Sequence, residues 1–322
     1  MNIVAFAGGV GGAKLADGLA RAVGPQFLSV IVNTADDFAL YGLHISPDVD
    51  TVMYTLAGVA NLATGWGVAD DTLRNFGMLE RYGAKPWFRI GDSDMATHLL
   101  RTQMLDEGSA LTDVTAELAH RLGVASRILP MTDDRVRTVV ETEDGLLAFQ
   151  EYFVKHRWRP VVRNIIFEGI VDAEPSAQVL RAIETADTIV FCPSNPYLSV
   201  DPILQLHGVR DALLNAVAPI IAVTPIVGGE AVKGPAAKIM QELGTEPSPV
   251  SIARHYAEFI NGFVLDATDA ARRPDIEGMG LGVLVTDTIM RTRDDRARLA
   301  CEIVTFADDL RPEKMGGCNP PP

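Results

Sequence analysis

The first 32 residues of the chain constrain its fold more than any other part. Residues 2–7 form a short apolar run, typical of a buried strand, which ends in four glycines and one valine at residues 8–12. The residues that follow, up to 23, place apolar side chains four positions apart and predict a helix, and residues 27–32 predict a second strand. A strand, a helix and a strand in this order indicate a parallel sheet.

The rest of the chain repeats this pattern and interrupts it once. Five further segments have the continuous apolar character of buried strands: residues 164–167, 188–191, 220–223, 262–265 and 282–285. Helical patterns lie between most of them, at residues 178–185, 203–216 and 230–243, and a last one follows at 294–308. Residues 50–122 are mainly helical in periodicity, and residues 135–153 alternate like an antiparallel hairpin with its turn at 142–145.

These patterns predict an α/β fold, in which a doubly wound, mostly parallel Rossmann-like sheet is interrupted by a mainly helical insertion. The predicted nucleotide-binding core is discontinuous and consists of residues 1–48 and 160–310. Residues 49–159 form the insertion with its β-hairpin, and residues 311–322 form a flexible tail.

The charge of the chain limits its partners. At a formal net charge of −14, it is unsuited to nucleic acid and to an anionic membrane surface, so an anionic ligand must be held locally by a few cations, backbone amides or a metal. The three cysteines, Cys192, Cys301 and Cys318, are too far apart to indicate a disulfide framework or a zinc site. The N-terminus shows neither a basic leader region nor a cleavage site, and we expect a soluble, cytoplasmic protein.

The glycine stretch predicts a phosphate or diphosphate site, because bare backbone amides at a helix N-terminus attract anions. It matches neither familiar fingerprint. A Walker A loop needs Ser or Thr after the lysine, where this chain has Leu15, and a dinucleotide motif counted from Gly9 needs a third glycine where Lys14 stands. The alternative is a tight turn that needs glycine only for its backbone angles.

Acidic residues follow the second predicted strand, where the carboxyl ends of parallel strands form the ligand crevice. Asp36 and Asp37 end that strand, and Asp48 and Asp50 begin the next helical pattern. Asp36 and Asp50 could together supply two carboxylates for magnesium. Whether Asp37 or Asp48 shares the metal stays open. Each acid could instead only cap a helix or a turn.

Polar residues elsewhere leave similar alternatives. Asp94, His98 and Arg101 share one face of a predicted helix, which forms either a surface ion-pair stripe or a polar wall of the site. The loops at 192–196 and 224–235 follow predicted strands and carry small and hydrogen-bonding residues, so they suit phosphate or serve only as turns.

A set of motifs runs in order along nearly the whole chain. They are Ala7-Gly-Gly-Val-Gly-Gly-Ala-Lys14, Asp36-Asp37, Pro47-Asp-Val-Asp-Thr51, Gly65-Trp-Gly67, Gly91-Asp-Ser-Asp-Met-Ala-Thr-His98, Pro193-Ser-Asn-Pro196, Pro225-Ile-Val-Gly-Gly229, Lys233-Gly-Pro235 and Thr286-Asp-Thr288. From residue 1 to about 310, the chain resembles the 2-phospho-L-lactate transferase family of coenzyme F420 biosynthesis.

The resemblance implies a magnesium-dependent transferase of substituted phosphate groups. Its donor is a phospho-acid (2-phospho-L-lactate, phosphoenolpyruvate or 3-phosphoglycerate) linked to guanosine diphosphate, and its acceptor is the deazaflavin FO, 7,8-didemethyl-8-hydroxy-5-deazariboflavin. The terminal ribityl hydroxyl attacks, GMP leaves, and F420-0 or its dehydro or glyceryl analogue forms. The resemblance also implies a homodimer and an insertion that binds the acceptor. It leaves the physiological phospho-acid open.

The resemblance also assigns roles to residues. Asp36 and Asp50 are the implied catalytic residues and metal ligands, and Asp50, Arg89 and Trp66 are implied to bind FO. The implied nucleotide and phosphate site consists of Gly8, Gly9, Gly11, Gly12, Lys14, Ser194, Asn195, Gly228, Gly229 and Lys233.

An alternative of another class is a non-catalytic, nucleotide-sugar-binding regulatory protein of related fold. Such regulators usually continue their Asp-Asp pair with Gly-Gly-Ser-Ser. Here Asp37 is followed by Phe38, Ala39 and Leu40, and this departure favours the transferase.

Overall fold

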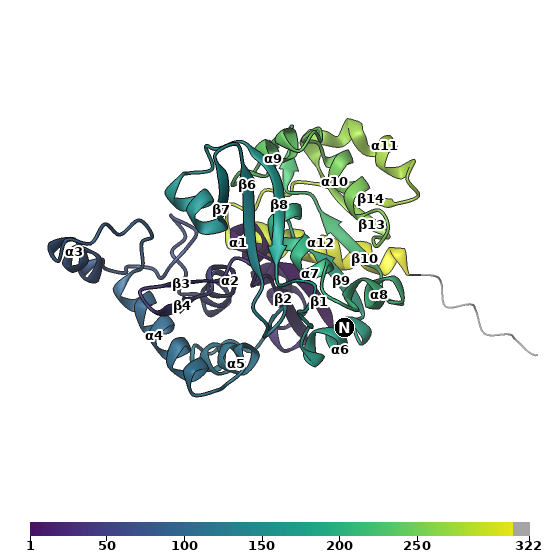
Figure 1. The fold of residues 1–322 in the computed structure, drawn as a ribbon. Helices are drawn as coiled ribbons and strands as arrows, with labels where there is room; N and C mark the ends of the chain where they lie inside the picture. Colours follow the sequence, from purple (N-terminus) through teal and green to yellow (C-terminus); the bar gives the residue numbers. More distant parts are fainter. Residues whose placement is uncertain (312–322) are drawn as a thin grey trace, which may run out of the picture.

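A seven-stranded parallel sheet forms the centre of the protein in a computed structural model that describes residues 1–311 (Figure 1). Its strand order is β14-β13-β10-β9-β1-β2-β5, and neighbouring strands all pair in parallel. The strands are β1 (Ile3–Ala7), β2 (Leu28–Val32), β5 (Arg127–Pro130), β9 (Thr188–Phe191), β10 (Ile220–Val223), β13 (Gly262–Asp266) and β14 (Gly282–Thr286). The predicted doubly wound, mostly parallel sheet is confirmed.

Helices cover both faces of this sheet, which explains why its strands are apolar throughout. Alternate side chains of a strand enter one of two apolar cores: Phe6 faces one core, and Ala5 and Ala7 face the other. The first core lies under α6 (Ala177–Glu184), α7 (Asp201–Leu204), α8 (Val209–Leu214), α9 (Ala236–Glu242), α10 (Pro249–Tyr256) and α11 (Arg273–Glu277). The second lies under α1 (Gly9–Val23), α2 (Pro47–Ala57), α5 (Leu111–Arg121) and α12 (Arg293–Leu310).

The region predicted to be mainly helical contains four helices. They are α2, α3 (Arg74–Arg81), α4 (Asp92–Asp106) and α5. Helix α3 has no buried residue and projects from the body of the molecule at the left of Figure 1. A small hairpin of β3 (Phe38–Leu40) and β4 (Leu43–Ile45) was not predicted. Its two turn residues, Tyr41 and Gly42, both adopt positive φ, as a two-residue hairpin turn requires.

The predicted hairpin is confirmed, but the strand after it was assigned to the wrong sheet. β6 (Arg137–Thr142) pairs with β7 (Gly145–Ala148), and β8 (Val162–Glu168) pairs antiparallel with β6 rather than joining the central sheet. Most residues of β8 are exposed or half-buried, because this three-stranded sheet has a face in contact with solvent. An apolar run alone does not distinguish these two positions.

Other predicted boundaries also need correction. β5 lies inside the predicted insertion, yet it forms the edge of the central sheet next to β2. The helix predicted at 203–216 is divided into α7 and α8, with Gly208 in the left-handed region between them, and the one predicted at 230–243 begins only at Ala236. The division into core and insertion stays a prediction, and the predicted tail lies outside the described residues except for Arg311.

The remaining elements are short. They are β11 (Ile226–Val227), β12 (Glu230–Ala231), the 3-10 helices η1 (Pro25–Phe27) and η4 (Ala267–Arg272), and the π-helical turns η2 (Glu151–Lys155) and η3 (Pro196–Val200). Within residues 1–311, no helix combines the length and apolar character needed to cross a membrane.

Candidate active site

A cavity of about 910 Å³ lies at the carboxyl ends of the central strands. The sheet order reverses at β1, which has β2 on one side and β9 on the other, and such a switch point is where open α/β sheets bind ligands. Eleven of the predicted site residues line this cavity: Gly8, Gly9, Gly11, Lys14, Asp36, Asp50, Trp66, Arg89, Ser194, Asn195 and Lys233. Gly12, Gly228 and Gly229 do not line it; the last two form the turn between β11 and β12.

The glycine stretch approaches the protein's own backbone. It forms the first turn of α1, where Gly9 has a φ of 61° and donates its N–H to Asp48 Oδ1 at 2.8 Å. A Cβ atom on Gly11 would overlap the carbonyl oxygen of Pro193, so glycine is required there for close packing. The hydroxyl of Ser194 accepts from Gly8 N–H at 3.1 Å and donates to Gly8 O at 2.9 Å. These two hydrogen bonds therefore hold the glycine turn against the loop that follows β9.

The side chain of Asn195 also makes hydrogen bonds within the protein. Its Oδ1 accepts from the N–H groups of Tyr197 and Leu198 at 3.1 and 3.3 Å and caps the turn η3. The side chains of Ser194 and Asn195, which the resemblance assigns to the nucleotide, thus shape the wall of the cavity through internal hydrogen bonds.

We expect Gly11→Ala to lower the free energy of unfolding by about 1–3 kcal/mol, the usual effect of overpacking at a close approach. Urea unfolding measures this change. Gly77→Ala is the matched control, because a Cβ at Gly77 meets open space on the exposed helix α3. Equal stability of the two variants would contradict the close approach at Pro193.

Two buried carboxylates lie beside the glycine turn. Asp36 follows β2 and is 5% exposed, and its Oδ1 has no hydrogen-bond partner among the described residues. Burial, and then the charge of Asp48, raise the pKa of Asp36 well above its ordinary value. Burial also raises the pKa of Asp48 to about 6, against the opposing effect of hydrogen bonds from Asn33 and Gly9. Adjacent buried carboxylates with an unused oxygen are suited to a cation.

This pair predicts a pH dependence of stability. Asp48 has a pKa of about 6 in the folded chain and 3.8 ordinarily, so between these values the unfolded chain has released a proton that the folded chain retains. With divalent cations chelated, the free energy of unfolding should therefore fall as pH rises from about 4 to 7, by up to about 3 kcal/mol from Asp48.

Urea unfolding across this pH range, with wild type and Asp48→Asn compared, measures the contribution of Asp48. The variant should show a flatter profile, because amide replaces the titrating group. Identical profiles would show that Asp48 ionises as readily in the folded chain as in the unfolded one.

Asp50 is held by a different set of groups. Arg101, which is fully buried, donates from Nη1 to Asp50 Oδ2 at 3.0 Å and from Nη2 to Oδ1. Burial acts to lower the pKa of Arg101, but Asp50 raises it above its ordinary value, so the guanidinium stays charged. Both oxygens of the Asp50 carboxylate are therefore paired with Arg101. The charges that raise the pKa of Asp36 are those of Asp48 and Asp37, not that of Asp50.

Helix α4 completes a polar wall around Asp50. His98 Nδ1 lies 3.3 Å from Arg101 Nη1; since arginine can only donate, Nδ1 accepts and the ring proton of neutral His98 is on Nε2. That nitrogen lies 3.3 Å from Asp94 Oδ1, which also accepts from the Tyr54 hydroxyl at 2.8 Å. Asp94, His98 and Arg101 are all buried, so the surface-stripe interpretation is wrong. Asp94 and His98 line the cavity, whereas Arg101 does not.

Two lysines supply positive charge at the sheet end of the cavity. Lys14 donates to the carbonyl oxygen of Met290 at 3.0 Å, and Lys233 donates to that of Thr64 at 2.9 Å. Burial lowers the pKa of both lysines, and nearby positive charges lower that of Lys14 further. Neither ammonium has a carboxylate partner among residues 1–311, so both are free to neutralise an anion.

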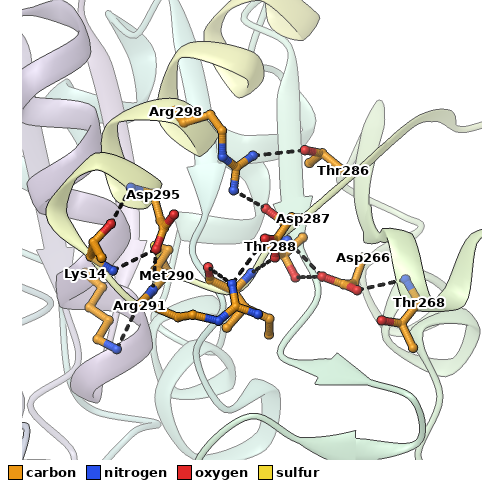
Figure 2. A network of polar contacts seen from close by, with 12 residues as sticks. Lys14, Asp266, Thr268, Thr286, Asp287, Thr288, Met290, Arg291, Asp295 and Arg298 are labelled. Carbon is orange, nitrogen blue, oxygen red and sulfur yellow. Dashed lines mark hydrogen bonds and ion pairs between the residues drawn. The ribbon is translucent and has the colours of Figure 1, made fainter.

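The segment after β14 carries a polar network that fixes another part of the wall (Figure 2). Thr288 donates from its N–H and its hydroxyl to Asp266 Oδ2 at 2.8 and 2.9 Å. Arg298 donates to the carbonyl oxygen of Asp287 at 2.6 Å, and the Asp287 carboxylate accepts from Arg291 at 3.2 Å. These contacts tie the ends of β13 and β14 to α12 and hold Thr288 and Arg291 at the cavity.

The wall contributed by residues 49–159 contains a set of aromatic rings. They are those of Tyr54, Trp66, Phe76, Trp87, Phe88, Phe149 and Phe153. Phe149 and Phe153 stack with their centroids 5.3 Å apart, and Trp87 meets Phe88 edge-on at 5.8 Å. Such a wall favours a flat, aromatic ligand. Arg89 and Arg157 line the cavity with these rings.

Sequence reasoning missed several of these residues. The sequence left open whether Asp37 or Asp48 shares the metal. The pairing of Arg101 with Asp50 had no signal because 51 positions separate them. Phe149, Phe153 and Arg157 recur every four residues, which indicates a helical face. That spacing was available in the sequence but was read as the end of the hairpin.

Comparison with known proteins is consistent with this geometry. The family model described as 2-phospho-L-lactate transferase CofD matches residues 3–287. A phosphoenolpyruvate transferase of Streptomyces griseus is 41% identical over 317 residues, which are 97% of this chain and 100% of that protein. A 2-phospho-L-lactate transferase of Methanopyrus kandleri is 40% identical over 312 residues, which are 96% of this chain and 99% of that protein.

A solved structure supports the fold alone. The crystal structure of a UPF0052 family member from Bacillus halodurans aligns with a TM-score of 0.63 at 16% identity, and the alignment covers 94% of this chain and 98% of that one.

Proposed function

The chain belongs to the 2-phospho-L-lactate transferase CofD family, and we propose that it transfers a phospho-acid from its guanosine diphosphate adduct to FO in coenzyme F420 biosynthesis. The terminal ribityl hydroxyl of FO forms a new bond to the phosphorus next to the organic acid. The bond from that phosphorus to the bridging oxygen breaks, GMP leaves, and the hydroxyl proton is released. The product is a phosphodiester.

The observation that carries this proposal is a single cavity with two kinds of wall. The strand ends contribute bare backbone together with Lys14 and Lys233, which suit a diphosphate. Residues 49–159 contribute a set of aromatic rings that suit a flat deazaflavin. Trp66 is one of these rings, and Arg89 lines the cavity with them. A volume of about 910 Å³ is sufficient for two substrates to meet.

Magnesium fits the buried acids of this site. Asp36 has an unused carboxylate oxygen, and Asp48 lies near enough to raise its pKa. Among the described residues, the oxygens of Asp48 accept hydrogen bonds only from the neutral groups of Gly9 and Asn33, which leave its charge uncompensated. We therefore assign the ion to Asp36 and Asp48. When bound, magnesium would neutralise charge on the transferring phosphoryl group and its leaving group. We assign Asp50, whose two oxygens are held by Arg101, to orienting the acceptor hydroxyl.

The names of the relatives do not select the donor. A phosphoenolpyruvate transferase and a 2-phospho-L-lactate transferase are 41% and 40% identical to this chain, and both align over nearly its whole length. The two acids differ only in the carbons beside the carboxylate. We propose that the residues lining this cavity determine which of the two is transferred. The homodimer stays a prediction.

Release of GMP tests the proposed reaction against the regulatory alternative. We expect purified protein with magnesium and a guanosine diphosphate adduct to release GMP only when FO is added. Tight binding of a nucleotide sugar, with no GMP released from any adduct, would favour a non-catalytic regulator.

A further inference from the structure

The segment from Phe149 to Trp158 combines a π-helical turn with two consecutive non-glycine residues in the left-handed region. It contains the π-helical turn η2, a rare element that is frequent at functional sites. Arg157 and Trp158 follow with φ of 52° and 45°, and they are the only consecutive non-glycine residues with positive φ in the described part of the chain. Side chains with a Cβ rarely adopt this conformation, and it persists where the surroundings impose it.

Contacts at both ends hold this segment against the site. Gln150 donates from Nε2 to the carbonyl oxygen of Asp36 at 3.4 Å, which places the start of the segment beside the buried carboxylates. Phe153 stacks on Phe149 and packs against Trp158 at 5.2 Å, and the Trp158 N–H donates to Tyr152 O at 2.9 Å. The strained turn is therefore fixed in position, and it carries Arg157 to the cavity wall.

The Arg157 guanidinium has no polar partner in the described part of the chain. Among residues 1–311, its side chain makes no hydrogen bond and no ion pair, although the chain carries a net charge of −14. Arg89 also lines the cavity without a side-chain hydrogen bond or ion pair among the described residues, whereas Lys14, Lys233 and Arg291 each contact a carbonyl or carboxylate oxygen. Arg157 is exposed, and it lines both the substrate cavity and a second pocket that contains Glu143 and Asp144. An exposed, unpaired guanidinium at the wall of a substrate cavity is available to bind an anion.

We propose that Arg157 is a specificity-determining residue that binds an anionic oxygen of a substrate. The assignment rests on the proposed function, which offers two such groups: the carboxylate of the transferred phospho-acid and the ionised ring hydroxyl of the deazaflavin. The guanidinium fork can engage either through charge-assisted hydrogen bonds.

Steady-state kinetics of Arg157→Ala and Arg157→Gly test this role. Loss of a charge-assisted hydrogen bond should raise KM for one substrate about 10- to 100-fold, with a smaller change in kcat. An increase for the adduct identifies the carboxylate as the bound group, and an increase for FO identifies the ring hydroxyl. Arg157→Lys should recover part of the loss because it retains the charge.

Thermal unfolding separates this role from a structural one. Arg157→Gly should melt no lower than wild type, because glycine adopts a positive φ without steric conflict. Arg159→Ala is the matched control: Arg159 is a neighbouring exposed arginine that does not line the cavity, so its KM values should be unchanged.

Unchanged KM values in both Arg157 variants, in a preparation whose wild type is active, would overturn this assignment and leave the transferase in place. A lower melting temperature for Arg157→Gly with unchanged KM would do the same and make the residue structural. A wild type that transfers nothing would overturn the proposed function, and this assignment with it.

Discussion

Replacing Asp36 by Asn should abolish transfer and leave the fold at least as stable as that of the wild type. The rate should fall by about three orders of magnitude or more, because loss of a magnesium ligand removes several kcal/mol of charge stabilisation in the transition state. Stability should not fall, because the carboxylate is buried with an unused oxygen and its pKa is raised by burial and by Asp48. The amide has nearly the same shape and carries no charge.

Three measurements separate these effects. Turnover of the adduct with FO gives the rate, urea unfolding without magnesium gives the stability, and calorimetry with GDP tests the nucleotide site. Asp113→Asn is the control, because Asp113 lies on the exposed side of α5, away from the cavity. A variant that retains activity, or that unfolds more easily than wild type, would contradict the assignment of Asp36.

Replacing Asp50 by Asn should abolish turnover as well, but it should also destabilise the fold. The variant leaves the Arg101 guanidinium buried without its anion, which commonly costs about 3–5 kcal/mol. Binding of GDP should survive in the folded fraction, because the lysines and the glycine turn are separate from this ion pair.

A double variant distinguishes the structural loss from the catalytic one. Asp50→Asn combined with Arg101→Met removes both charges and should recover most of the stability without recovering transfer. Recovery of turnover in the double variant would show that Asp50 serves only to neutralise Arg101. Loss of GDP binding in a stable variant would place Asp50 at the nucleotide instead.

The parallel sheet was predictable because its signal is local. The run of residues 2–7, the glycine turn and the first helix follow one another directly, and β1 is buried on both faces. β5 was missed because only two of its residues, Ile128 and Leu129, are strongly apolar and because it lies at the sheet edge. β8 was misplaced because strand pairing depends on distant partners that an apolar run does not name.

The candidate site was predictable in its location and less so in its contacts. Residues that follow strands converge on one edge of a parallel sheet, and most of the predicted side chains accordingly line one cavity. The glycines indicated a close approach, but only the fold shows that Pro193 and Asp48 are what approaches. Likewise, no local pattern shows that Arg101 pairs with Asp50, or that Asp48 is the acid whose charge acts on Asp36.

The most direct test of the proposed function is to identify the product. The purified protein would be incubated with magnesium, FO and each of the three guanosine diphosphate adducts in turn, and the deazaflavin products would be analysed by mass spectrometry. We expect one adduct to yield an FO phosphodiester together with an equal amount of GMP, which names the donor at the same time. No deazaflavin product from any adduct, in a protein that still binds the nucleotide, would contradict the transferase and leave a cavity that only binds.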